Sequence, residues 1–209
     1  MAARGIYVKT SIRAPLESVW HATQDPTQHV RWDVRFTSIA PTSTTDAGAT
    51  RFVYTRRVPL HTVHGTGISL GEVTRSDGTR TSALRFTTSD RLSPIRDGRG
   101  YWRYVPTDDG AISFITGYDY SSGWGVLDVV VRPVIGWATA WSFDRLRIWL
   151  ETGVAPEQWP LWSVLWFWRA NRPQAGRCKR KPHGGSRRAD HLNAAPETLK
   201  TLADPEGTV

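Results

Sequence analysis

The sequence predicts an α+β domain in which a curved antiparallel sheet of about six or seven strands wraps around a long C-terminal helix. Three observations predict it. The chain opens with alternating hydrophobic residues and continues directly into two short helical segments. Short strand-like segments separated by turn residues come next. Helical periodicity then returns and lasts from residue 126 to residue 152.

Residues 5–12 form the first expected strand, because hydrophobic residues recur there at every second position. The pattern stops at Pro15, which cannot donate a ladder hydrogen bond but suits the first turn of a helix. We expect this helix to end near Asp25, where another proline follows, and a second helical turn to span 27–30.

The middle of the chain is expected to form an antiparallel meander. Its strand-like segments are short, and turns rich in Asp and Gly separate them, so that neighbours in sequence pair with each other. The expected strands are 36–40, 50–58, 62–73, 81–87, 100–107 and 111–120, with turns at Asp46-Ala47-Gly48, Ser76-Asp77-Gly78, Asp97-Gly98 and Asp109-Gly110.

Residues 126–152 form the expected long helix, with Pro133 where its main part could begin and Gly153 where it could end. A long helix that follows a meander must bury one face against the sheet. Beside a strongly curved sheet, a broad aromatic face of this kind leaves an interior space. The residues expected on that face are Val130, Val134, Trp137, Ala138, Trp141, Arg145, Ile148 and Trp149.

Several segments carry a family resemblance: 6–12, 14–20, 25–26, 32–33, 100–106, 117–120 and 136–146. They resemble the START-like superfamily, which includes polyketide cyclase/dehydrase-like proteins, lipid-transfer domains and plant pollen-allergen-like proteins. Within it, the pattern is similar to an actinobacterial subgroup of unassigned activity. The resemblance implies a helix-grip fold with an apolar cavity between the sheet and the C-terminal helix. It does not decide between carrier and cyclase, since one fold hosts both.

The chain of 209 residues contains one cysteine, Cys178, so that no intramolecular disulfide can form. The N-terminus leads straight into the first strand pattern without a secretion signal. We therefore expect a cytoplasmic protein, or one that meets the membrane peripherally at its inner face. The formal charge of +8 is uneven, because residues 1–168 carry 18 basic and 15 acidic residues, whereas residues 169–209 carry 9 and 4.

We expect three segments: a START-like ligand-binding domain at 5–153, a Trp-rich apolar segment at 154–170 and a basic, disordered tail at 171–209. Tryptophan-rich sequence followed by clustered cations is typical of an interfacial membrane anchor, so residues 159–188 are expected to face an anionic membrane surface. Alternatively, the Trp-rich segment folds back over the domain or builds a dimer interface. Nucleic-acid binding by the basic run is disfavoured, because no recognition module surrounds it. The oligomeric state is left open.

The hairpin 100–120 carries the most informative candidate residues. A two-residue turn at Asp109-Gly110 would set Tyr101 opposite Tyr118 and leave Arg103 as a lone cation among rings. That guanidinium would suit a carboxylate, phosphate or enolate. Alternatively, the two faces are swapped or Arg103 pairs with an internal acid. The expected ligand-binding residues are Tyr54, Phe86, Tyr101, Arg103, Phe114, Thr116, Tyr118, Tyr120, Val134, Trp137 and Trp141.

The favoured function is a non-catalytic binder or carrier of a hydrophobic small molecule, lipid or polyketide-like. The first alternative is a polyketide cyclase or aromatase, in which Arg103 and Tyr118 polarise a carbonyl and His64 acts as base. In the plainer interpretation, His61 and His64 are strand-end residues at the rim. The second alternative is a membrane-surface scaffold that uses the Trp-rich basic tail.

No cofactor is expected. No metal is expected either, because His61 and His64 lack a third convergent ligand. Asp33 and Arg35 are interpreted as an ion pair that fixes their loop rather than as ligand contacts.

Overall fold

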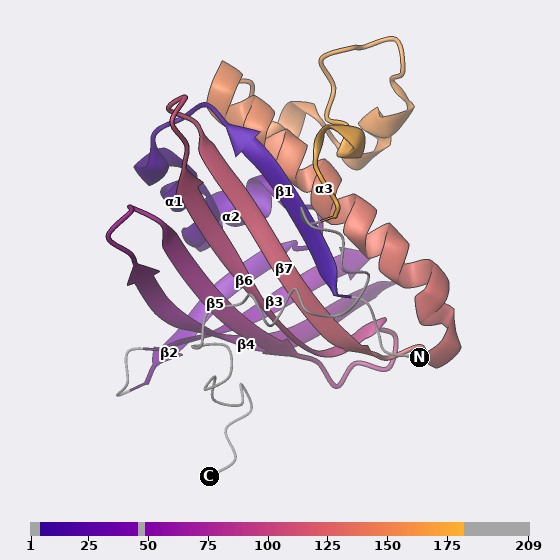
Figure 1. Cartoon of the computed structure of the whole chain (residues 1–209). Helices are drawn as coiled ribbons and strands as arrows, with labels where there is room; N and C mark the ends of the chain where they lie inside the picture. Colours follow the sequence, from indigo (N-terminus) through magenta and orange to yellow (C-terminus); the bar gives the residue numbers. More distant parts are fainter. Residues whose placement is uncertain (1–4, 46–48, 182–209) are drawn as a thin grey trace.

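The computed structural model describes residues 5–45 and 49–181, and its largest element is a seven-stranded antiparallel sheet (Figure 1). The strands stand in the order β1-β7-β6-β5-β4-β3-β2, so that β1 joins the last strand and the others follow as a meander. The predicted fold class is confirmed. The strands are β1 (Ile6–Ile12), β2 (Ser38–Thr44), β3 (Thr50–Val58), β4 (His61–Thr74), β5 (Arg80–Thr87), β6 (Ile95–Pro106) and β7 (Ile112–Ser122).

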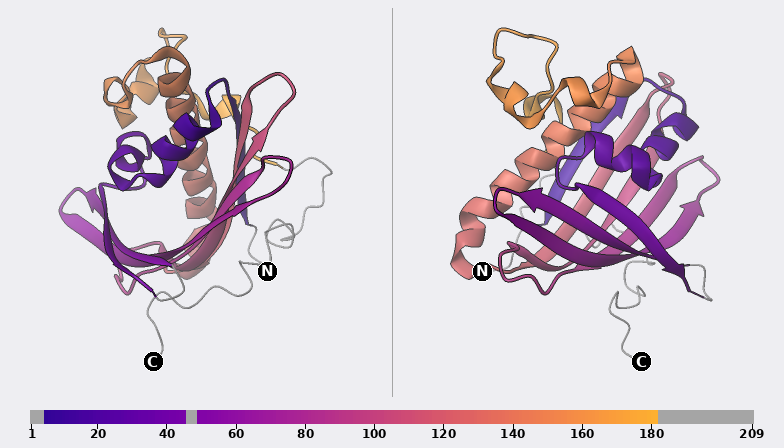
Figure 2. Two further views of the ribbon diagram at one scale, coloured as in Figure 1. Left: turned by 90° about the vertical axis from the view of Figure 1, so that its left-hand side faces the viewer. Right: turned by 180° about the vertical axis from the view of Figure 1, so that it is seen from behind.

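Two short helices, α1 (Leu16–Gln24) and α2 (Pro26–Trp32), connect β1 to β2. Asp25 ends the first helix and caps the second, since its carboxylate accepts the Thr27 backbone N–H at 2.7 Å. The Trp32 indole N–H donates to the Ala22 carbonyl at 2.8 Å and so joins the two helices. Both helices lie on the face of the sheet that α3 also covers (Figure 2).

The long helix α3 spans Asp128–Thr152 and follows a short turn, η1 (Gly125–Leu127). It ends at Gly153, whose φ of 73° lies in the left-handed region that glycine adopts without strain. The end of this helix is therefore where the sequence predicts it. Its start is not, because Pro133 lies inside the helix. The sheet curves around α3 as a helix-grip (Figure 2).

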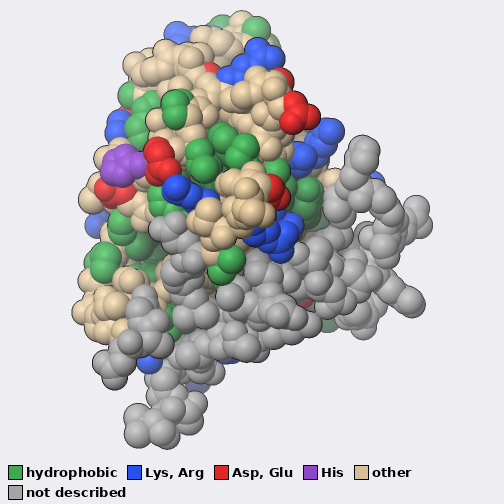
Figure 3. Space-filling model, turned by 60° about the vertical axis from the view of Figure 1, so that its left-hand side comes forward, with side chains coloured by type: hydrophobic (Ala, Val, Ile, Leu, Met, Phe, Trp, Pro, Cys, Tyr) green, Lys and Arg blue, Asp and Glu red, His purple; other side chains and the backbone are tan. Residues whose placement is uncertain are grey.

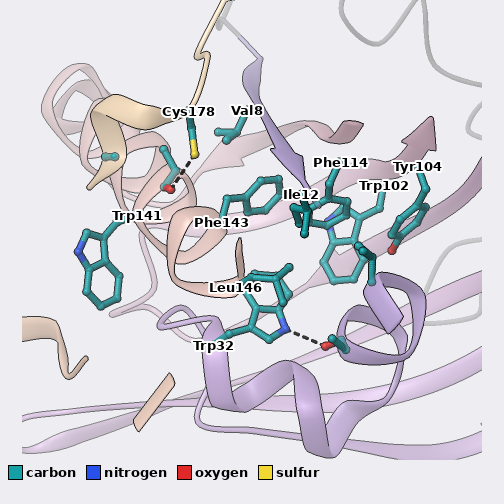
Figure 4. Close-up of a cluster of buried hydrophobic side chains, with 14 of the residues drawn as sticks. Val8, Ile12, Trp32, Trp102, Tyr104, Phe114, Trp141, Phe143, Leu146 and Cys178 are labelled. Atoms are coloured by element: carbon teal, nitrogen blue, oxygen red, sulfur yellow. Dashed lines mark hydrogen bonds between the residues drawn. The ribbon is translucent and has the colours of Figure 1, made fainter. Parts of the chain in front are cut away.

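Aromatic side chains fill one end of the grip, where α1, α2 and the C-terminal half of α3 meet β6 and β7 (Figure 4). Phe143 of α3 stacks on Phe114 of β7 with ring centroids 4.5 Å apart. Trp32 meets the edges of both rings. These side chains are buried, so this end of the grip forms the hydrophobic core.

The β6–β7 hairpin differs from the predicted register by one residue. Gly100 pairs with Tyr118, and Tyr101 pairs with Gly117. The loop has three residues between Thr107 and Ala111, not two, because Gly110 adopts a φ of 76° and extends the turn. Since side chains alternate along a strand, a one-residue slip on β6 moves every side chain to the opposite face.

The segment after α3 folds back over that helix through three short turns, η2 (Pro156–Gln158), η3 (Leu161–Leu165) and η4 (Ala175–Arg177). The buried Asp144 carboxylate of α3 accepts from the Gln174 backbone N–H at 2.8 Å and from Arg177 at 3.0 Å. Lys179 pairs with Lys9 at the edge of β1. The first part of the predicted disordered tail, residues 171–181, is therefore packed on the domain, while residues 182–209 lie outside the described residues.

Candidate ligand-binding site

The face of the sheet turned toward the helices, here called the inner face, carries an aromatic floor made of Phe52, Tyr54 and Phe86. Each ring lies flat on a glycine of a neighbouring strand. A Cβ added at Gly67 would lie 2.3 Å from the Phe52 ring, and one at Gly65 or Gly98 would lie 2.2 Å from Tyr54 or Phe86. Glycine is required where another group approaches the backbone this closely. The rings therefore run along the sheet rather than across the interior, and Phe52 and Phe86 stay partly exposed.

A buried polar cluster lies beside this floor, between α2 and the sheet. The Asp33 carboxylate accepts two hydrogen bonds from the Arg35 guanidinium, at 2.9 and 2.6 Å. The interpretation of Asp33 and Arg35 as an ion pair is confirmed. His29 Nε2 lies 3.1 Å from Asp33, and its ring stacks on Trp32. Phe36 touches both His29 and Tyr54, so the cluster and the floor are continuous.

Burial and pairing set the charges of this cluster. Burial lowers the pKa of His29, Arg35 lowers it further, and the bond to Asp33 opposes both, so that the imidazole is neutral at pH 7. Burial disfavours the charge of Asp33, yet Arg35 and His29 outweigh it and hold the pKa of the carboxyl well below its usual range. The result is a satisfied ion pair with a neutral imidazole beside it.

Arg56 lies on the inner face of β3, two residues after Tyr54. It is partly buried, and with the residues that the structure describes it makes no hydrogen bond or ion pair. Burial lowers the pKa of its guanidinium, while Asp33 acts in the opposite direction. A desolvated cation without a direct partner can accept an anionic group from a ligand.

Two tyrosines of β7 tie the inner face to α3. The Tyr118 hydroxyl lies 2.8 Å from the Thr139 hydroxyl, and burial raises the pKa of this phenol. The Tyr120 hydroxyl donates to Asp128 at 2.9 Å, which places it at the start of the helix. Both phenols are therefore engaged in internal hydrogen bonds.

The structure brings six of the predicted ligand-binding residues to the inner face. Tyr54 and Phe86 belong to the aromatic floor. Phe114 is packed in the filled end of the grip, away from the floor. Thr116, Tyr118 and Tyr120 follow Phe114 on the same face of β7 at every second position.

Tyr101 and Arg103 lie on the opposite, outer face, which corrects the prediction that they line the cavity. Trp102 between them enters the core, and Tyr101 packs against the outer side of Gly117. Arg103 lies over the Tyr101 ring at 5.1 Å. The sequence left open that the two faces of the hairpin are swapped, and this is the case for β6. The three-residue turn causes the swap, because it shifts the register of β6 by one residue.

His64 is exposed and also faces outward, because its neighbour Gly65 carries the Tyr54 ring on the inner side. The predicted trio of Tyr118, Arg103 and His64 is therefore not brought together. His61 lies 2.7 Å from Asp90 and is partly buried.

The predicted face of α3 is wrong as well. Thr139 and Phe143 face the sheet, whereas Trp137 and Trp141 face the segment that folds back over the helix. Figure 4 shows Trp141 pointing to the opposite side of α3 from Phe143. Val134 is 56% exposed. The physical reason is that α3 has two apolar faces, and the more aromatic one packs under the later segment.

Sequence reasoning missed His29, Phe52 and Arg56. The spacing of His29 and Asp33, one helical turn apart, was an available signal for their contact. The alternation of Phe52, Tyr54 and Arg56 along one strand was another. Neither signal indicates which face of the strand turns inward.

Within 5–45 and 49–181, no group of three or more His, Cys, Asp or Glu side chains is placed to hold a metal ion. The same residues contain one helical stretch, Gly125–Thr152, that is long and apolar enough to cross a membrane by length and composition. It consists of η1 and α3, and 28% of its most apolar 18-residue stretch is buried in the protein.

Solved structures with the same architecture have low sequence identity to this chain. The Zhui aromatase/cyclase from Streptomyces sp. R1128 is 12% identical at a TM-score of 0.51, with 73% of this chain and 98% of that chain covered. A START superfamily protein from Mycobacterium smegmatis is 10% identical at a TM-score of 0.50, with 69% of this chain and 94% of that chain covered. The human StarD13 lipid transfer and protein localization domain is 12% identical at a TM-score of 0.50, covering 70% and 77%. These likenesses show the START-like fold.

No family model matches the sequence. A relative does match: the uncharacterized membrane protein YndG of Bacillus subtilis (strain 168) is 34% identical over 186 residues, which cover 81% of this chain and 69% of YndG. The resemblance to an actinobacterial subgroup stays an expectation. The chain has the START-like helix-grip fold and belongs to the family that contains YndG.

Proposed function

We propose that the chain binds a hydrophobic small molecule, lipid or polyketide-like, on the aromatic floor inside the grip. The observation that carries this proposal is the flat packing of Phe52, Tyr54 and Phe86 on three glycines. Rings laid along the sheet offer their faces to the interior, whereas Trp102 and Phe114 stand in the filled end and are buried. Apolar lining with few polar groups is typical of small-molecule sites.

The polar groups beside the floor favour a ligand with an acidic head. Arg35 is neutralised by Asp33, so it does not need an anion from outside. Arg56 faces the interior without such a partner among the described residues. Arg56 therefore takes the role that the sequence assigned to Arg103, that of a cation for a carboxylate, phosphate or enolate.

Binding without catalysis is the function we favour over a cyclase. A cyclase needs at least two polar groups that converge on one reacting atom. Of the three residues expected to supply them, only Tyr118 lies on the inner face, and its hydroxyl is engaged by Thr139. The names of the structural neighbours, an aromatase/cyclase and a lipid transfer domain, support a hydrophobic ligand of either class.

Two fluorescent dyes with similar apolar bodies test this site. Anilinonaphthalene sulfonate carries an acidic head and phenyl-naphthylamine does not. We expect Phe52→Leu to weaken the binding of both dyes. Arg56→Met should weaken the binding of the sulfonate dye alone, by about tenfold for the loss of one charge-assisted hydrogen bond. Val53→Ala and Arg57→Met are matched controls, since both residues are exposed neighbours on the same strand. Equal binding by wild type, Phe52→Leu and Arg56→Met would contradict the proposal.

A second function, attachment to a membrane surface, is favoured by a separate observation. Eleven of the sixteen exposed large hydrophobic side chains among the described residues fall within 124–134 and 161–168. On the face seen in Figure 3, hydrophobic side chains instead form small groups with charged side chains between them. The name of the relative YndG, a membrane protein, supports the same placement. We propose that these two segments contact the membrane.

A further inference from the structure

One face of α3 carries a continuous apolar stripe, Val130, Val134, Trp137 and Trp141, at the spacing of successive helical turns. The N-terminal part of this stripe is exposed, at 64% for Val130 and 56% for Val134. Its C-terminal part, Trp137 and Trp141, is covered by the segment that folds back over the helix. The stripe therefore passes from open surface into a contact within the same protein.

A pocket of about 350 Å³ lies where the stripe meets that segment. Trp137 and Trp141 form one wall, and Val164 of η3 lies on the other. Arg172 and Arg180 also line it, and no acidic residue does so among those described. The pocket is separate from the aromatic floor, because α3 lies between them.

Two buried donors in this lining make no hydrogen bond with the part of the chain that the structure describes. The Trp141 side chain is 1% exposed, and its Nε1 makes no hydrogen bond with the residues described. Arg172 Nε is likewise buried without a partner, although another nitrogen of the same guanidinium reaches the Pro173 carbonyl at 3.3 Å. Buried donors are rarely left without an acceptor. Together with Arg180, they form a pocket suited to an oxyanion.

The surroundings of the pocket are apolar and exposed. Val164 is flanked in sequence by Leu161, Trp162 and Leu165, all exposed. Val134, which is exposed, lies three residues before Trp137 on α3. An oxyanion bound here would therefore sit between hydrophobic side chains, as the headgroup of a lipid does at the boundary of a bilayer.

We propose that this pocket takes the phosphate of an anionic membrane phospholipid, with Trp141, Arg172 and Arg180 as its donors. The proposal rests on the membrane attachment proposed above and names its lipid class. The exposed hydrophobic side chains on both sides enter the boundary region of the bilayer, and the phosphate fills the pocket between them.

The test uses the full chain and sedimentation with two kinds of vesicle, phosphatidylcholine alone and phosphatidylcholine with phosphatidylglycerol. We expect tighter binding to the second. Arg172→Met should reduce that affinity by about tenfold and Trp141→Phe, which removes the N–H and keeps the ring, by about threefold. Arg169→Met is the matched control, because it removes one charge from the same segment without touching the pocket. Thermal unfolding checks that each variant keeps its fold.

The outcomes separate the two proposals. If wild type binds neither vesicle, membrane attachment itself is wrong. If it binds both equally, or if Arg172→Met and Arg169→Met have equal effects, attachment stands and the phosphate pocket is overturned. Competition by soluble glycerol phosphate decides the source of the anion. Glycerol phosphate that binds as tightly as the vesicles would overturn a membrane lipid as the natural occupant.

Discussion

The two halves of α3 lie in different environments although they form one uninterrupted helix. Every buried residue of α3 belongs to its C-terminal half, residues 139–152, and none to residues 128–138. The C-terminal half has β7 and α2 on one side and the segment 156–178 on the other. The N-terminal half lies beside Ile6 and Tyr120 of the sheet and leaves Val130 and Val134 exposed on its opposite face. A single hydrophobic pattern thus serves a core in one half and a surface in the other.

This difference separates stability from binding. The enclosed half holds the fold together through rings and a buried carboxylate. The open half has apolar side chains that stabilise little while they face water. Substitutions in the two halves should therefore have different consequences, and the following predictions run from the largest expected effect to the smallest.

Replacement of Phe143 by alanine should destabilise the protein by about 3–5 kcal/mol. The side chain is fully buried and stacks on Phe114, so its loss leaves a cavity between the helix and β7. Urea unfolding followed by tryptophan fluorescence measures the change. A loss below about 1 kcal/mol would mean that the enclosed half is not a packed core.

Asp144→Asn should lower the free energy of unfolding by about 2–3 kcal/mol, because the fully buried Asp144 carboxylate accepts from Arg177 and from the Gln174 backbone N–H, and hydrogen bonds to a charged group are the stronger ones. It should also loosen the segment 171–181. Cys178 reports on this, since burial, together with the Asp144 charge, raises the pKa of its thiol to about 12. A disulfide reagent should therefore react slowly with wild type at pH 8 and faster with the variant. Unchanged thiol kinetics would show that Asp144 does not hold this segment.

Acidification should weaken the wild-type fold through His29. Its pKa is lowered in the folded protein, so below its ordinary value of about 6.5 the unfolded chain binds a proton that the folded chain does not. Stability is therefore lost as the pH falls from 6.5 toward the lower folded pKa. His29→Gln keeps a donor for Asp33 and should show a smaller loss between pH 6.5 and 5 in thermal unfolding. Parallel pH profiles for the two proteins would exclude His29 as the cause.

Val130→Ala should change the stability by no more than about 0.5 kcal/mol, since the side chain is exposed and alanine favours helix. The same substitution should weaken vesicle binding if the open half enters a membrane. Urea unfolding of this variant measures the change in stability, and sedimentation with vesicles measures the change in membrane binding. A large loss of stability here would contradict the exposed position of Val130.

The order of the elements and some of their ends could be predicted, because local signals determine them. Alternation identifies β1, the proline after Asp25 starts α2, and Gly153 ends α3. The ion pair of Asp33 with Arg35 also follows from residues two positions apart. These features depend on the chain's own backbone preferences and nearest neighbours, which a sequence shows directly.

Which face of an element is buried was decided by the tertiary structure. The Asp109-Gly110 turn allows a two-residue or a three-residue loop, and the choice moves Arg103 and Tyr101 from the inner to the outer face. Similarly, Trp137 and Trp141 pack under a segment that the sequence assigned partly to a disordered tail. By itself, the sequence determined that this chain folds as a sheet around a helix. The packing of distant segments determined where the aromatic floor and the pocket beside α3 lie, because the burial of a side chain depends on partners that are far away in the sequence.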